Sequence, residues 1–261
     1  MTGLSRRAAK PAARAAGPPG PAPGASPRPG GYFGWSRDPA VALLGVLPLW
    51  FVYELLRLDL APAERNGAEA LVVDSLKVFG PQAIVVLRVL LGLCVLAAAI
   101  SVMRRDLPWA KVAAVAALEG AVYGILLGPV TQALTLFLID GGALVAGRLG
   151  ADIVGSIGAG IFEEAVFRLG MLPLLAMSLS RACAAFGLHR ALGVLAAVLL
   201  SALAFSWFHH VGAGGESYEP RVFAFRAVAG IVLGLLFVVR GFAVVVYAHA
   251  FYDIHFYVTN R

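Results

Sequence analysis

The sequence predicts an all-α protein, a polytopic transmembrane helical bundle of about seven to eight spans. Apolar residues make up 60% of the chain and charged residues only 14%, whereas soluble domains carry about 25% charged residues. The apolar residues gather in runs long enough to cross a bilayer core of about 30 Å as helices. Ionisable residues inside such runs are costly in lipid, so we expect them to form a site inside the bundle.

Residues 1–37 are predicted to be a disordered, basic cytoplasmic tail. This segment is rich in Pro, Ala and Gly and has too little apolar surface to form a core. Basic residues ahead of the first apolar run favour a cytoplasmic N-terminus. The predicted location is therefore the cell membrane, which the chain crosses several times.

Two groups of apolar runs follow the tail, in residues 38–148 and in residues 149–261. The runs cover residues 39–56, 81–103, 109–138, 153–179, 191–211, 224–239 and 242–258. A polar amphipathic stretch separates the first two runs, and Gly128-Pro129 breaks the third, so one additional re-entrant element would give eight. Lys and Arg residues alternate between the two sides when the N-terminus is inside, in agreement with seven spans. Gly230 and Gly234, four residues apart, would permit close helix packing.

Three of these runs carry polar residues, one of them with an aromatic partner, at helical spacing. They are Glu163, Glu164 and Arg168 on the first, Phe205 and His209 on the second, and His249 and Asp253 on the third. Residues four apart share a helix face, so Arg168 is expected to pair with Glu164. Glu163 lies about 100° further around the helix and can face a cavity and the two histidines.

This set of side chains could activate a water molecule for hydrolysis of an amide or ester. Glu163 would be the general base, and His209 would hold the same water. His249 with a polar partner could stabilise the oxyanion of a tetrahedral intermediate. Alternatively, the charges form only a structural ion pair and the histidines only pack. No cofactor is predicted, although Glu163, His209 and His249 could together hold a divalent metal such as zinc with an open fourth position.

The motifs Glu163-Glu164-x-x-x-Arg168, Phe205-x-x-x-His209 and His249-x-x-x-Asp253 resemble those of the CPBP family, which includes CAAX endopeptidases and bacteriocin-immunity-type membrane proteases. The resemblance implies that residues 149–261 form a catalytic transmembrane domain. It implies an endopeptidase acting on membrane-associated or lipid-anchored proteins, including the processing of C-terminal tails. Glu163 and His209 would activate water, and His249 and Asp253 would hold the oxyanion, with Glu164, Arg168 and Phe205 in support. Asparagine often ends the third motif, and an ionised Asp253 cannot donate a hydrogen bond.

Two other functions remain open from the sequence. The polar residues could line a path in a transporter or channel, or the protein could be an inactive immunity-type scaffold. The expected partners are the lipid bilayer and a membrane protein or lipidated peptide, not nucleic acid; the oligomeric state is left open. Glu119, in the third run, is expected to cap a polar cavity, to pair with an arginine such as Arg168 or Arg226, or to lie near the membrane interface.

Overall fold

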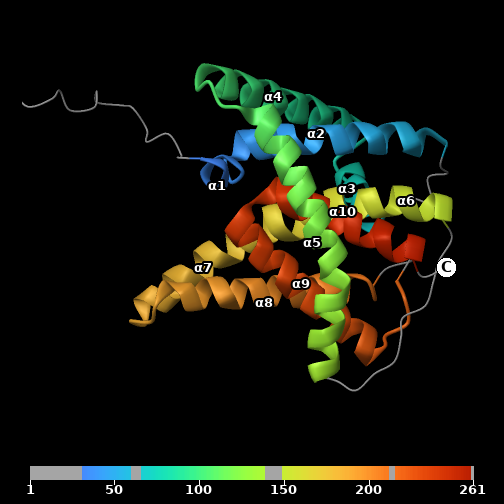
Figure 1. The fold of residues 1–261 in the computed structure, drawn as a ribbon, viewed down its shortest axis with the longest axis vertical. Coiled ribbons are helices and arrows are strands. Elements are labelled where there is room, and N and C mark those ends of the chain that lie inside the picture. Colours follow the sequence, from blue (N-terminus) through green and yellow to red (C-terminus); the bar gives the residue numbers. More distant parts are fainter. Residues whose placement is uncertain (1–30, 60–65, 139–148, 212–214, 260–261) are drawn as a thin grey trace, which may run out of the picture.

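The computed structural model describes residues 31–59, 66–138, 149–211 and 215–259, in which every regular element is helical. Six helices are long and apolar enough to cross a membrane, which confirms the predicted polytopic helical bundle. They are α2 (Pro39–Leu56), α4 (Gln82–Arg104), α5 (Trp109–Leu138), the segment Ile153–Ala185, α8 (Arg190–Phe208) and α9 (Pro220–Arg240). The chain is a multi-pass membrane protein (Figure 1).

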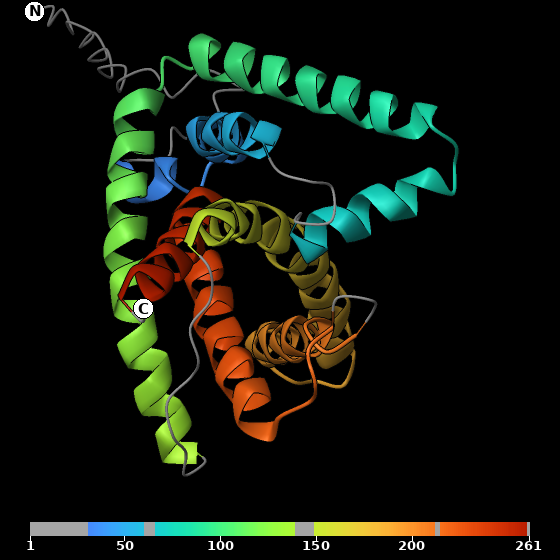
Figure 2. The ribbon, with the colours of Figure 1, turned by 90° about the vertical axis from the view of Figure 1, so that its right-hand side faces the viewer.

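The predicted last span, α10 (Phe242–Thr259), is not among these six helices. Its first half is enclosed by protein, with residues 243–250 all buried. Helix α5 crosses it closely: a Cβ atom on Gly120 would lie 2.5 Å from Tyr247 Cβ, and one on Gly124 would lie 2.7 Å from the Ala248 carbonyl oxygen. The first half of helix α10 therefore passes through the interior of the bundle (Figures 1 and 2), where neighbouring side chains surround His249.

The segment Ile153–Ala185, where the sequence predicted a span over residues 153–179, is helical but is not one continuous α-helix. Helix α6 (Leu149–Gly158) passes into two π-helical segments, η3 (Ala159–Glu163) and η4 (Ala165–Met171), before α7 (Leu172–Ala185) begins. In π-helices the backbone bonds run from residue i to i+5, an arrangement frequent at functional sites. The sequence pattern did not indicate the π-helical turns, because α and π turns have side-chain periods too similar to separate over one or two turns.

Close contacts at glycine fix the positions of η3 and α9. A Cβ on Gly160 would lie 2.7 Å from the Val246 carbonyl oxygen, so only glycine lets η3 approach α10 this closely. A Cβ on Gly230 would lie 3.0 Å from Ala202 Cα, and one on Gly234 would lie 3.1 Å from a Val198 methyl group. The predicted role of Gly230 and Gly234 in helix packing is therefore confirmed.

The tightest glycine contact joins α7 to α8. A Cβ on Gly193 would lie 2.4 Å from the Ser180 backbone nitrogen, and neither backbone can yield without separating the two helices. We expect Gly193→Ala to destabilise the protein by about 1–3 kcal/mol, measured as a lower melting temperature in detergent. Gly92→Ala is the matched control, since no atom lies within 4 Å of the position that its methyl group would take. Alanine there should be neutral or stabilising; equal losses in both variants would contradict the packing argument.

A short helix, α1 (Tyr32–Trp35), lies ahead of α2 and against the end of α9. Residues 1–30 of the predicted tail lie outside the described residues, but residues 31–37 do not behave as tail. The Arg240 guanidinium lies 4.4 Å from the Phe33 ring centre, and Tyr32 donates a hydrogen bond to Glu119. The tail prediction therefore extended too far, because Arg240 supplies α1 with a partner that the local composition does not show.

Glu119 pairs with Arg240, not with Arg168 or Arg226. Arg240 Nε lies 2.5 Å from Glu119 Oε1, and Nη2 lies 2.7 Å from Oε2. The predicted partners are engaged elsewhere: Arg168 binds Glu164, and Arg226 binds Glu216 at 2.8 Å. The hydrogen bond from Arg226 holds the pKa of the Glu216 carboxyl below its usual range.

Helix α3 (Gly67–Lys77) forms the connection between α2 and α4, after the short turn η1 (Arg57–Asp59). Helix α3 packs against the π-helical segment η3. Glu69 fixes α3 to α2 by accepting a hydrogen bond from the buried Tyr53 hydroxyl and lying 3.0 Å from Arg57. This amphipathic stretch is thus held against the part of the bundle that carries Glu163.

Candidate active site

Glu164 and Arg168 form the predicted ion pair inside the bundle. Both side chains are buried, and Arg168 Nη1 lies 3.1 Å from Glu164 Oε1. The guanidinium also lies 4.4 Å from the centre of the Phe205 ring. Glu164 Oε1 in addition accepts a 2.7 Å hydrogen bond from His249 Nδ1. The pair therefore does more than neutralise a charge, because it orients a histidine on another helix.

Glu163 faces the two histidines, as its position on the helix predicted. Its Oε2 atom lies 3.7 Å from His209 Nε2 and 3.9 Å from His249 Nε2. These separations are too long for direct hydrogen bonds, and Oε2 is buried without a hydrogen-bond partner among the described residues. A buried carboxylate oxygen in this state is a strong acceptor that is open to a third molecule.

The backbone fixes which nitrogen of His209 carries hydrogen. His209 Nδ1 lies 2.9 Å from the Phe205 carbonyl oxygen, which can only accept, so Nδ1 donates. In the neutral ring Nε2 is then an acceptor that faces the acceptor Glu163 Oε2. Two facing acceptors require a donor to both, and a water molecule has two O–H groups. The geometry suits a water held between Glu163 and His209.

His249 and Asp253 share one face of α10, as predicted. Asp253 Oδ2 lies 3.6 Å from His249 Nε2, and His249 Nδ1 donates to Glu164. A protonated His249 has a second donor at Nε2, directed toward the same region as Glu163. The Phe205 ring packs edge-on against both histidine rings, with centroids 5.0 Å from His209 and 5.9 Å from His249. The structure thus brings all seven predicted residues together.

Asn66 is a site residue that the sequence analysis missed. Its Nδ2 atom donates a 2.9 Å hydrogen bond to Glu163 Oε1. Its Oδ1 atom accepts from the Ala68 backbone N–H at 2.8 Å and so caps α3. An asparagine just before a helix predicts an N-cap, but nothing local indicates a contact with a residue 97 positions away.

The two bonds of Asn66 can be separated by mutation. Serine keeps an N-cap acceptor but has no group equivalent to Nδ2. We expect Asn66→Ser to retain the melting temperature and to lower hydrolytic activity about 10- to 100-fold, since a hydrogen bond to a charged group contributes about 1.5–3 kcal/mol. Asn66→Ala removes both bonds and should also melt earlier. Full activity in the serine variant would show that the contact with Glu163 has no role.

The metal alternative gains no direct support from the spacing of the side chains. Among the described residues, no group of three or more His, Cys, Asp or Glu side chains is arranged to hold a metal ion. The predicted ligands would be Glu163, His209 and His249, and each histidine Nε2 atom lies within 4 Å of Glu163 Oε2. Metal dependence stays a prediction that chelation can test.

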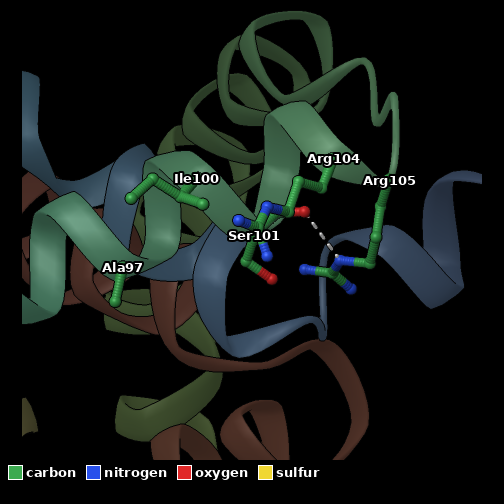
Figure 3. A pocket seen from close by; sticks show the side chains of 5 residues that line it. All are labelled: Ala97, Ile100, Ser101, Arg104 and Arg105. Carbon is green, nitrogen blue, oxygen red and sulfur yellow. Dashed lines mark hydrogen bonds between the residues drawn. The ribbon is translucent and has the colours of Figure 1, made fainter.

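A shallow hollow at the end of α4 lies apart from this cluster (Figure 3). It is lined by Ala97, Ile100, Ser101, Arg104 and Arg105, none of which belongs to the predicted site. Arg105 is paired with Asp38, the N-cap of α2, and this hydrogen bond holds the pKa of the Asp38 carboxyl below its usual range. We assign the hollow no catalytic role.

Comparison with known proteins agrees with the motifs. Residues 147–255 match the family model described as type II CAAX prenyl endopeptidase Rce1-like. The match includes all seven predicted site residues and leaves Asn66 and helices α1 to α5 outside. No curated protein and no solved structure matches the chain. The predicted resemblance to CAAX-type membrane proteases is confirmed over this segment.

Proposed function

We propose that this protein, whose residues 147–255 match the Rce1-like family of type II CAAX prenyl endopeptidases, cleaves peptide bonds of membrane-associated or lipid-anchored proteins. The family match supports a CAAX-type intramembrane protease in general. One observation carries the specific mechanism: a buried, unpartnered oxygen of Glu163 faces the Nε2 atoms of two histidines on other elements.

In the proposed reaction, Glu163 acts as the general base. A water molecule donates one hydrogen bond to Glu163 Oε2 and the other to His209 Nε2. As its oxygen attacks the scissile carbonyl carbon, Glu163 accepts the proton and a tetrahedral intermediate forms. Collapse of this intermediate breaks the C–N bond, and the proton passes from Glu163 to the departing amine. The products are a new carboxyl terminus and a new amino terminus.

The remaining side chains stabilise charge and hold geometry. A protonated His249 can donate from Nε2 to the oxyanion, while Glu164 holds its Nδ1 side at 2.7 Å. Arg168 fixes Glu164, and Phe205 packs against both imidazole rings. Asp253, 3.6 Å from His249 Nε2, favours the charged ring rather than donating itself. This assignment gives Asp253 a role that does not require it to be protonated.

The test is cleavage by the purified protein in lipid nanodiscs. Membrane proteins from the native host are added, and new chain termini are identified by mass spectrometry. Wild type should generate termini that are absent with His209→Ala; identical cleavage by both would contradict the assigned site. A chelator arm tests the metal alternative, which predicts loss of cleavage and its recovery with zinc. Glu163-dependent ion flux into liposomes without any cleavage would favour the transporter alternative.

A further inference from the structure

The candidate site lies toward one end of the helical bundle. His209 directly follows the last residue of α8, and Asn66 lies in the connection after α2. The opposite end carries α1, the start of α2 and the turn between α7 and α8. In Figure 1 these elements lie on the left, whereas the C-terminus and the start of α6 lie on the right; Figure 2 shows the right-hand end facing the viewer. We refer to the two as the α1 end and the site end.

Side-chain exposure increases toward the site end. Glu164 and Arg168 are 0% and 1% exposed, and Glu163 is 6% exposed. His209 is 21% exposed and Asp253 is 22% exposed. Both lie on the site-end side of the cluster, one after the end of α8 and the other in the second half of α10. The buried Arg168–Glu164 pair thus closes the cluster on the side of the α1 end. The route from outside the protein to Glu163 runs past His209 and Asp253.

Positive charge concentrates at the α1 end. By helix order, twelve of the 21 Lys and Arg residues fall at or before this end and eight at the site end, while Arg168 lies inside the bundle. The α1 end has Arg37, Arg104, Arg105, Lys111, Arg181, Arg190 and Arg240 among the described residues, and the sequence before α1 adds Arg6, Arg7, Lys10, Arg14 and Arg28. The site end has Arg57, Lys77, Arg88, Arg221 and Arg226 among the described residues, and Arg65, Arg148 and Arg261 flank its helices in the sequence. Short cytoplasmic connections carry the excess of Lys and Arg in membrane proteins.

We propose that the site opens on the non-cytoplasmic face of the membrane and that its substrates are membrane-attached proteins whose cleaved bond lies on that face. That the protein has a protein substrate rests on the proposed function. The orientation of the site in the membrane rests only on helix ends, side-chain exposure and charge. A lipidated tail that stays in the cytoplasm meets the α1 end, where the Arg168–Glu164 pair separates it from Glu163. The substrate class is therefore a peptide segment exposed after translocation and close to a membrane anchor.

Cysteine labelling in intact cells tests the orientation without any need for activity. The native Cys94 and Cys183 are first replaced by alanine, and single cysteines are then introduced by Glu219→Cys at the site end and Leu188→Cys in the α7–α8 turn. Both positions are exposed. A membrane-impermeant maleimide should label the Glu219→Cys variant in intact cells and the Leu188→Cys variant only after permeabilisation. The reverse pattern would overturn the proposal.

Access to the site itself needs a third variant. His209→Cys should be labelled in intact cells, more slowly than Glu219→Cys because its side chain is partly buried. If Glu219→Cys is labelled and His209→Cys reacts only after permeabilisation, the site does not open on that face and the proposal fails. The cleavage assay is a separate readout. The expected labelling with no cleavage would overturn the proposed function and leave the orientation standing. Cleavage with the reverse labelling would support the proposed function and overturn the orientation.

Discussion

Glu163→Gln is expected to lower peptide-bond cleavage about 100- to 10,000-fold while the protein stays folded, because a positioned general base typically contributes this much. Glutamine has nearly the same shape, and its side-chain oxygen can still accept the 2.9 Å hydrogen bond from Asn66. It cannot take a proton from water. The measurement is the rate at which new termini appear in nanodiscs, with the melting temperature as a check on folding.

Glu219→Gln is the matched control for this substitution. Glu219 is exposed at the start of α9 and makes no side-chain cap to the helix, so the same chemical change there should leave the rate unaltered. Equal rates for wild type and Glu163→Gln would rule out Glu163 as the base. A large drop in melting temperature would instead mean that Glu163 serves mainly to hold α3 through Asn66.

Arg168→Leu is expected to cost about 3–5 kcal/mol of stability, the range measured when one partner of a buried ion pair is removed. Glu164 is fully buried and would keep its charge with only His249 as a partner. The guanidinium also loses its contact with the Phe205 ring, 4.4 Å away. The loss should appear as a lower melting temperature in detergent, together with lower activity because Glu164 no longer holds His249 firmly.

Two further variants separate the ion pair from general packing. Arg181→Leu removes an exposed arginine of α7 and should change stability by less than about 0.5 kcal/mol. The double variant Arg168→Leu with Glu164→Gln leaves no unpaired charge and keeps an acceptor for His249, so it should recover part of the stability lost in Arg168→Leu. If Arg168→Leu melts like Arg181→Leu, the pair is not the brace inferred here.

The parts of the site that the sequence predicted depend on spacing along a single helix. Glu164 and Arg168 are four apart, as are His249 and Asp253, and both pairs meet in the structure. Spacing along one helix does not predict that the three helices come together. We expected this because polar groups are costly in lipid and because the motifs resemble those of a known family. The bond from Glu164 to His249 was not predicted, since two helices can approach in many rotations that bury the same residues.

The parts that the sequence did not predict depend on contacts between distant segments. Asn66 reaches Glu163 across 97 positions, and Arg240 reaches Glu119 across 121. In the sequence, Asn66 is explained as a helix cap and Arg240 as a charge flanking a span, so neither residue indicates its distant partner. The π-helical form of η3 and η4 was also missed, because over one or two turns the side-chain pattern does not separate it from an α-helix. A single sequence specifies the helices well and their mutual register poorly.

The burial of α10 has a consequence for how the protein is made. This helix follows all the others in the sequence and is not among those apolar enough to qualify as a span. We therefore expect its insertion during synthesis to depend on α5, whose Gly120 and Gly124 form the surface that receives it. Because α10 brings His249 and Asp253, a nascent chain contains Glu163 and His209 but no oxyanion-binding histidine until this helix docks. Hydrolysis would thus begin only once biogenesis is complete, so the unfinished chain would not attack other proteins that are being inserted alongside it.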